Sequence, residues 1–242
     1  MKVALWIWRM ARMLAGDVRH MFFPDVCAVC GRSLVEGEQT LCLECDAAMP
    51  RTGFHLDADN RLYYTLLSQH IPLVHAVSMF HYAASNPYSR IIVDTKYHDM
   101  PQLGRAMGRK YAAEIASSGV FDDVDMLVPV PMHWFKQLRR GYNQAYEIAL
   151  GVADIAGLPV ADVRASRRHG SQTRRRAYER LLNARRVYGV ADVDAIAGRH
   201  IMLVDDVITT GATLVSCCEA VRRQSPSTRI SVLTLAATSH RR

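Results

Sequence analysis

The chain has 242 residues, of which 50% are hydrophobic and 22% are charged. This composition excludes a chain that is disordered throughout and a collagen-like or low-complexity chain. The length predicts one main domain with a small accessory module. Lys and Arg total 30 against 23 Asp and Glu, which gives a formal net charge of +7. That surplus favours an anionic partner such as nucleic acid, polyphosphate or an acidic membrane surface, without deciding among them.

The N-terminal residues are hydrophobic enough to be compared with a targeting segment. Their longest uncharged run, Val3 to Trp8, is too short for the core of a signal peptide and far too short to span a bilayer. Apolar residues here recur at helical spacing. We therefore predict an amphipathic helix over residues 1–23 that packs on its own protein or on a partner rather than on a membrane surface. No membrane span is expected, and the chain is expected to be cytoplasmic.

Four of the six cysteines form two Cys-x-x-Cys pairs that are separated by eleven residues: Cys27, Cys30, Cys42 and Cys45. Two such pairs can supply four thiolates to one tetrahedral zinc ion. Gly31 permits the tight turn in which backbone amides donate to the sulfurs. A disulfide framework would need an export route that the N-terminus does not offer. We therefore predict a structural Zn²⁺ ion in a module spanning residues 24–50, and no catalytic zinc, because the protein fills all four positions.

Residues 51–75 are irregular in sequence and predict a connector with little structure of its own. Strand-like and helical patterns alternate from residue 76 onward. The predicted strands are 76–81, 126–130, 201–204 and 230–235, and the predicted helices are 86–98, 101–118, 143–155 and 211–223. This alternation predicts an α/β domain over residues 76–242, with a parallel sheet covered by helices on both faces. Cys217 and Cys218, on the last helix, are most simply buried small apolar residues.

Ligands of open parallel sheets bind beyond the carboxyl ends of the strands, which directs attention to the segments after residues 130 and 204. Asp205 and Asp206 follow the predicted strand 201–204, ahead of a loop made of Thr209, Thr210, Gly211, Ala212 and Thr213. Gly211 lets the backbone approach a ligand closely, and amides and hydroxyls at a helix N-terminus can donate to a phosphate. Two carboxylates beside a phosphate are reasonable if the ligand also offers sugar hydroxyls or a divalent cation. A helix cap needs only one such residue.

The run from Val204 to Thr213 resembles the phosphoribosyl-pyrophosphate (PRPP) signature of type I phosphoribosyltransferases. The resemblance implies that Asp205 and Asp206 are the catalytic carboxylates, which accept hydrogen bonds from the ribose hydroxyls. It also implies that residues 209–213 wrap the 5′-phosphate.

A second basic segment follows the predicted strand 126–130. Arg139, Arg140 and Gly141 precede a helix, and this arrangement suits a second anion such as a pyrophosphate, although a solvated Arg pair explains it equally well. Together with the first loop, the Val-Pro-Val-Pro and Arg-Gly-Tyr-Asn-Gln segments resemble the ComF/GntX family. This resemblance assigns six residues to the pyrophosphate side of the site: Val130, Pro131, Arg140, Gly141, Asn143 and Gln144.

Nine arginines and one acid, Glu179, lie between Arg164 and Arg186, so this segment alone carries +8. The resemblance places here the flexible loop that closes over PRPP, with family matches at Gln172, Arg176 and Arg180. Guanidinium groups could then stabilise the departing pyrophosphate. A patch for single-stranded nucleic acid and a solvated helix face are the alternatives.

The ComF/GntX resemblance covers nearly the whole chain. It implies a parallel-sheet type I phosphoribosyltransferase fold with a small N-terminal zinc-ribbon-like module, and Mg²⁺-dependent transfer of phosphoribosyl from PRPP or a related phosphosugar to an unidentified acceptor. Because ComF proteins are associated with natural transformation, the alternative is a protein that handles single-stranded DNA with DNA-processing partners and without turnover. A PRPP sensor is a third hypothesis. Lys96 and Tyr97 match a recurrent pair of the family, but a surface lysine explains Lys96 equally well.

Overall fold

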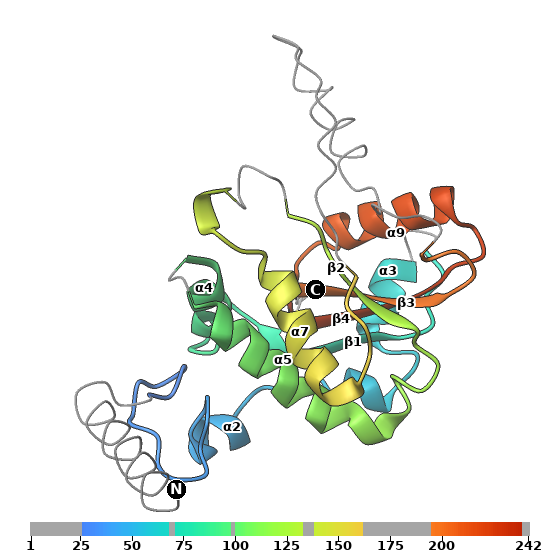
Figure 1. Ribbon diagram of the computed structural model, residues 1–242. Helices are drawn as coiled ribbons and strands as arrows, with labels where there is room; N and C mark the ends of the chain where they lie inside the picture. The colour runs from blue at the N-terminus through green and yellow to red at the C-terminus, as the bar shows by residue number, and fades with distance from the viewer. Residues whose placement is uncertain (1–25, 68–70, 98–99, 133–137, 162–194, 239–242) are drawn as a thin grey trace, which may run out of the picture. The chain divides into compact units, whose positions relative to one another are not determined.

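The computed structural model describes residues 26–67, 71–97, 100–132, 138–161 and 195–238 (Figure 1). The predicted helix over residues 1–23 and the arginine-rich segment, with Gln172, Arg176 and Arg180, lie outside the described residues. The chain divides between Met49 and Pro50 into two compact units.

The described part of the first unit is a short loop structure that is folded around the four cysteines. An antiparallel bridge joins Val26 to Ser33, and the amide of Cys27 donates to the carbonyl of Arg32 at 2.8 Å. Helix α2, Leu43–Ala47, has Cys42 as its N-cap and contains Cys45, so it holds the second cysteine pair. These turns bring the two Cys-x-x-Cys pairs close together in space.

The second unit is built on four parallel strands, in the order β1-β4-β3-β2. Their bounds are β1 Ala76–Tyr82, β2 Met126–Pro129, β3 His200–Ile208 and β4 Arg229–Thr238. The strands are almost continuously buried, as expected of a parallel sheet that is covered on both faces. The sheet therefore forms the centre of the unit.

Helices cover both faces of the sheet, as the sequence predicted (Figure 1). The bounds are α4 Ser89–Tyr97, α5 Pro101–Ile115 with the 3₁₀ turn η2 Ala116–Ser118, α7 Gln144–Ala156 and α9 Ala212–Gln224. Helices α5 and α7 pack against each other on one face, and α9 lies on the other. Two glycines allow the close approach of α5 and α7: a Cβ on Gly108 would lie 2.3 Å from the carbonyl oxygen of Ile148, and one on Gly151 would lie 2.0 Å from that of Arg105.

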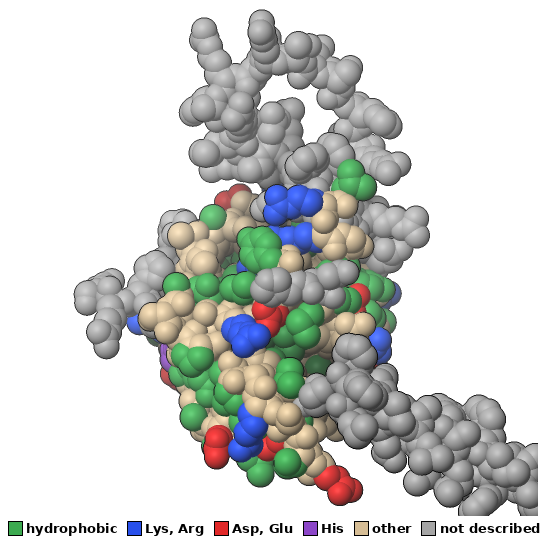
Figure 2. Space-filling model, turned by 90° about the vertical axis from the view of Figure 1, so that its left-hand side faces the viewer, with side chains coloured by type: hydrophobic (Ala, Val, Ile, Leu, Met, Phe, Trp, Pro, Cys, Tyr) green, Lys and Arg blue, Asp and Glu red, His purple; other side chains and the backbone are tan. Residues whose placement is uncertain are grey.

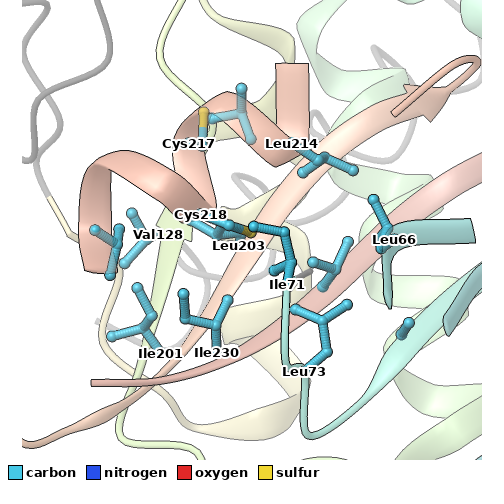
Figure 3. Close-up of a cluster of buried hydrophobic side chains, with 14 of the residues drawn as sticks. Leu66, Ile71, Leu73, Val128, Ile201, Leu203, Leu214, Cys217, Cys218 and Ile230 are labelled. Carbon is cyan, nitrogen blue, oxygen red and sulfur yellow. The ribbon is translucent and has the colours of Figure 1, made fainter. Parts of the chain in front are cut away.

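The core on the α9 face is formed by apolar side chains of the helix and the strands (Figure 3). Leu214, Cys217 and Cys218 of α9 lie against Val128, Ile201, Leu203 and Ile230 of the sheet. The interpretation of Cys217 and Cys218 as buried apolar residues is confirmed, since they are 4% and 0% exposed.

The prediction that residues 51–75 have little structure of their own is wrong. They form the 3₁₀ turn η1 Phe54–Leu56 and helix α3 Arg61–Leu67. Leu66 and Ile71 enter the same core as α9 (Figure 3), and the Asn60 side chain donates to the carbonyl of Ala76 at 2.9 Å. The residues just before this short helix are largely polar, so the sequence did not predict a packed element. Its buried leucines form part of a core only because the sheet lies beside them.

The connections that follow β2 and β3 run in opposite directions along the sheet. After β2, helix α7 leads to a short parallel bridge between Leu127 and Val160, on the outer side of β2. After β3, helix α9 leads the opposite way to β4. Crevices at such topological switch points are the usual ligand sites of open α/β sheets. Within the ranges that the structure describes, none of the helices has the length and apolar character of a membrane span.

Candidate functional site

A cavity of about 360 Å³ opens at this switch point, at the carboxyl ends of β2 and β3. Its lining includes most of the residues that the two sequence segments suggested: Val130, Pro131, Arg140, Asn143, Gln144, Asp205, Asp206, Thr209 and Thr213. Thr210, Gly211, Ala212 and Gly141 lie in the same loops but do not line it. The fold thus joins two segments that are about 60 residues apart in the chain.

The two aspartates lie within β3 rather than after it, because the strand continues to Ile208. Asp205 pairs in register with Thr234 of β4. Successive side chains of a strand point to opposite faces, so Asp205 shares the α9 face with Leu203, whereas Asp206 faces α4. The shorter predicted strand 201–204 concealed this division, since it placed both carboxylates in a loop.

The environments of the two carboxylates differ accordingly. Burial and the neighbouring charge of Asp206 raise the pKa of Asp205 to about 8, against a weaker opposing effect of the Asp206 amide. That amide donates to Asp205 Oδ1 at 2.9 Å. Asp206 Oδ2 lies 2.9 Å from Lys96 Nζ. At neutral pH the ligand-free site therefore holds a largely protonated carboxyl next to an ion-paired carboxylate.

The threonine loop leads from β3 into α9 through Gly211. This residue is the N-cap of α9 and has a left-handed φ of 77°, a conformation that glycine adopts without cost. A Cβ at Gly211 would also lie 3.1 Å from Leu66 Cδ2. Thr209 and Thr213 line the cavity beside the first turn of the helix, where backbone amides lack intrahelical acceptors. The loop therefore offers donors to an anion.

The start of α7 forms the opposite side of the cavity. Asn143 is its N-cap: the side-chain oxygen accepts from the amide of Ala145 at 3.0 Å, and Nδ2 donates to the carbonyl of Val130 at 3.1 Å. These bonds fix the helix start to the exit of β2. Gln144 is only 3% exposed and lines the cavity, and its buried Nε2 has no hydrogen-bond acceptor among the described residues. Asn143 is thus engaged structurally, whereas Gln144 has a donor to offer.

Sequence reasoning did not assign several residues that line the cavity, namely Lys96, Tyr97, Met132, Ala145 and Val207. The explanation of Lys96 as a surface lysine is wrong, because its side chain is 21% exposed and pairs with Asp206. Tyr97 lies beneath the Arg140 guanidinium, whose Cζ is 5.0 Å from the ring centroid. Only the family resemblance at Lys96 and Tyr97 could have drawn attention to them, since α4 carries no ligand-binding pattern of its own.

The four cysteines of the first unit form a candidate metal centre. Their sulfur atoms all lie within 4.8 Å of one another, and the Cys30 and Cys42 sulfurs are 3.8 Å apart. Zn–S bonds of about 2.3 Å place two sulfurs of a tetrahedron about 3.8 Å apart. The amide of Cys45 approaches the Cys42 sulfur at 3.5 Å, in the manner of a metal-binding turn. The residues therefore fit a structural Zn²⁺ ion.

The pKa values of two of these thiols are shifted in opposite directions. Burial alone would raise the pKa of Cys27, but amide donors, chiefly those of Cys30 and Cys42, outweigh it and lower that pKa to about 6. Burial and contacts with the sulfurs of Cys42 and Cys30 raise the pKa of Cys45. A bound Zn²⁺ ion would hold the thiols that coordinate it in their deprotonated form.

Basic side chains occur in separate groups on the face of the molecule that Figure 2 shows. Hydrophobic and uncharged polar side chains separate the Lys and Arg residues there. On this face, the described residues therefore form no broad basic surface.

Comparisons with known proteins match the part of the chain that contains the cavity residues, and most of the chain's length. A family model described as phosphoribosyl transferase domain matches residues 95–242. The chain is 26% identical to the DNA utilization protein YhgH of Escherichia coli O6:H1 over 214 residues, which are 84% of this chain and 86% of that protein. It is 25% identical to competence protein F of Haemophilus influenzae over 214 residues, 84% and 93% of the two chains. It is 26% identical to the YhgH protein of Salmonella typhimurium over 212 residues, 84% and 86%.

Proposed function

Because this chain belongs to the phosphoribosyl transferase domain family, we propose that it binds PRPP with Mg²⁺ and transfers the phosphoribosyl group to an acceptor, with release of pyrophosphate. The observation that carries the proposal is the cavity at the switch point. One helix start faces it from each side, and two aspartates lie between them.

The chemical groups of the cavity match the parts of PRPP. The 5′-phosphate would bind at the start of α9, where Thr209 and Thr213 supply hydroxyls. The pyrophosphate would lie toward α7, near Arg140 and the unpartnered amide of Gln144. The ribose would then lie between them, with its hydroxyls donating to Asp205 and Asp206, since carboxyl oxygens are good acceptors.

In this proposal the protein groups mainly orient the substrate and exclude water from it. Holding both ends of PRPP fixes the ribose carbon that the acceptor attacks, and positioning of this kind lowers the barrier substantially. Magnesium prefers oxygen ligands and is commonly bound through substrate phosphates. The ion would therefore be held chiefly by the oxygens of PRPP, and when bound it would neutralise charge on the leaving pyrophosphate. Arg140 would contribute to that neutralisation from the protein side.

The cysteine module has a structural role in this proposal, with one Zn²⁺ ion held by Cys27, Cys30, Cys42 and Cys45. Six cysteines, none of which forms a disulfide, suit a reducing compartment. A cytoplasmic location is therefore part of the proposal.

A second candidate function is the handling of single-stranded DNA with DNA-processing proteins. The names of the relatives, DNA utilization protein and competence protein F, favour it, as does the charge of +7. Here the cavity would bind DNA phosphates or PRPP without turnover. Binding of this kind weakens steeply with salt, so the salt dependence of single-stranded oligonucleotide binding tests this second candidate.

Thermal unfolding with PRPP and Mg²⁺ tests the main proposal. A ligand at about 100 times its Kd stabilises a protein by about 2.7 kcal/mol, so the melting temperature should rise by several degrees. The double variant Asp205→Asn, Asp206→Asn should lose this rise. The control variant Asp59→Asn, Asp122→Asn changes two exposed aspartates outside the cavity and should keep it. If PRPP leaves the melting temperature of the parent protein unchanged, the proposal fails. A pyrophosphate-release assay against nucleobases and amines then identifies the acceptor.

A further inference from the structure

The last three residues of α4 each make a separate contact, two of them with residues that line the cavity. The carbonyl of Thr95 accepts a hydrogen bond from the Tyr142 hydroxyl at 2.7 Å. Lys96 Nζ lies 2.9 Å from Asp206 Oδ2, and the Tyr97 ring lies under Arg140. One turn of helix thus connects the basic segment before α7 with the carboxylate pair on β3.

The contact of Lys96 with Asp206 changes the electrostatics of the cavity. Asp205 and Asp206 line the same cavity as Lys96 and Arg140. The Asp206 side chain is 9% exposed and that of Lys96 is 21% exposed, so water screens this pair only partly. Without the ammonium group, an ionised Asp206 would face an incoming phosphate directly, and like charges in such a setting repel strongly.

We infer that Lys96 is a positioning residue that offsets the charge of Asp206, and so allows a phosphorylated ligand to bind beside the carboxylate pair. The inference rests on the proposed function only for the identity of that ligand. The ammonium group of Lys96 explains how a site with two aspartates can bind an anion even when no Mg²⁺ ion is bound. It also gives Lys96 a role distinct from that of Arg140, which lies over the Tyr97 ring.

A purely structural role for the ammonium group fits these contacts less well. Thr95 and Tyr97 have their own contacts with Tyr142 and Arg140, so the end of α4 keeps two attachments when Lys96 is replaced. The stem of the lysine can be imitated by methionine, which preserves most of its volume and removes its charge. Lys96→Met therefore tests the charge with little change in packing.

The test is a double-mutant cycle between Lys96→Met and Asp206→Asn, measured by calorimetric titration with PRPP and Mg²⁺ and, separately, with inorganic pyrophosphate in EDTA. Lys96→Met should weaken binding of either titrant by about 10- to 100-fold, the range for losing one hydrogen bond to a charged group. Lys96→Arg should restore most of the affinity. With pyrophosphate, which lacks the ribose that Asp206 would bind, the combined variant should bind at least as tightly as Lys96→Met alone, because removing the uncompensated carboxylate cancels the repulsion. Lys110→Met, at the other lysine of the described residues, should change neither affinity.

Each result decides between the two ideas. If the combined variant binds pyrophosphate more weakly than Lys96→Met alone, or if Lys96→Met binds as the parent does, the inference is wrong. If the parent binds pyrophosphate but not PRPP, the proposed function fails, and the pyrophosphate cycle still tests the role of Lys96. If the parent binds neither, both ideas are rejected. Circular dichroism of every variant verifies that a loss of affinity does not reflect unfolding.

Discussion

Replacing Asp205 by asparagine should change how the stability of the ligand-free protein depends on pH. Burial and the charge of Asp206 raise the pKa of Asp205 to about 8, from the ordinary value of 3.8 for an aspartate. Between these pH values the folded state holds one proton more than the unfolded state. Its free energy of unfolding therefore falls as the pH rises, and the fall ends above about pH 8.

The size of the effect follows from the same linkage. Each pH unit within this window costs about 1.4 kcal/mol, so the range from about pH 6 to about pH 8 amounts to about 3 kcal/mol. This figure is an upper bound, because the Asp205 side chain retains partial contact with solvent. Asparagine cannot ionise, yet its Oδ1 can still accept the hydrogen bond from the Asp206 amide. The free energy of unfolding of the Asp205→Asn variant should therefore not show this decrease with rising pH.

Urea unfolding followed by circular dichroism at several pH values measures the difference between the parent and Asp205→Asn. The difference is the informative quantity, because other groups titrate in the same range. Burial lowers the pKa values of His75 and His81, which makes stability rise with pH and partly masks the effect in the parent alone. Asp59→Asn, at an exposed site, should follow the parent. Parallel profiles for the parent and Asp205→Asn would show that Asp205 ionises normally and that our account of its burial is wrong.

Three further predictions concern the parts of the fold that support the site. Elemental analysis should find one zinc ion per chain and none in Cys42→Ser, and retention of zinc by this variant would contradict the four-thiolate site. Gly151→Ala should lower the melting temperature, since its Cβ would lie 2.0 Å from the carbonyl oxygen of Arg105. Gly104→Ala, whose nearest contacts are at 3.6 Å, should be neutral or stabilising by up to about 1 kcal/mol. Equal effects of the two substitutions would refute this account of the α5 and α7 packing. Leu66→Ala should cost about 2 to 5 kcal/mol in chemical unfolding, as expected for a fully buried leucine, and a cost near zero would mean that α3 does not belong to the core.

The division of β3 between its two faces has consequences for the site. Adjacent aspartates in a loop would share one environment, whereas adjacent aspartates in a strand face opposite sides of the sheet. Here one faces a core that contains Cys217, and the other faces a lysine on α4. This is why one pair of identical residues can supply a carboxyl with a raised pKa and an ion-paired carboxylate.

The sequence alone identified the elements that depend on local pattern. Alternating strand and helix periodicities predicted the α/β sheet, and the Cys-x-x-Cys pairs predicted the cysteine cluster. The Asp-Asp and threonine-glycine run predicted the segment at the cavity. Each of these signals lies within a few neighbouring residues, where hydrogen bonding, ligand spacing and side-chain direction follow directly from residue type.

Only the tertiary structure decided which distant groups meet. The sequence left Lys96 as either a family match or a surface lysine, because nothing near it in the chain reveals that Asp206 lies 2.9 Å away. It ended β3 at residue 204, because two aspartates are rare inside a strand unless a cavity and a counter-ion accommodate them. It treated residues 51–75 as a connector, because two or three leucines on a short helix form a core only against a sheet that other parts of the chain provide. Pairing across a sheet and neutralisation of buried charge depend on the position of residues far away in the chain, and the fold fixes those positions.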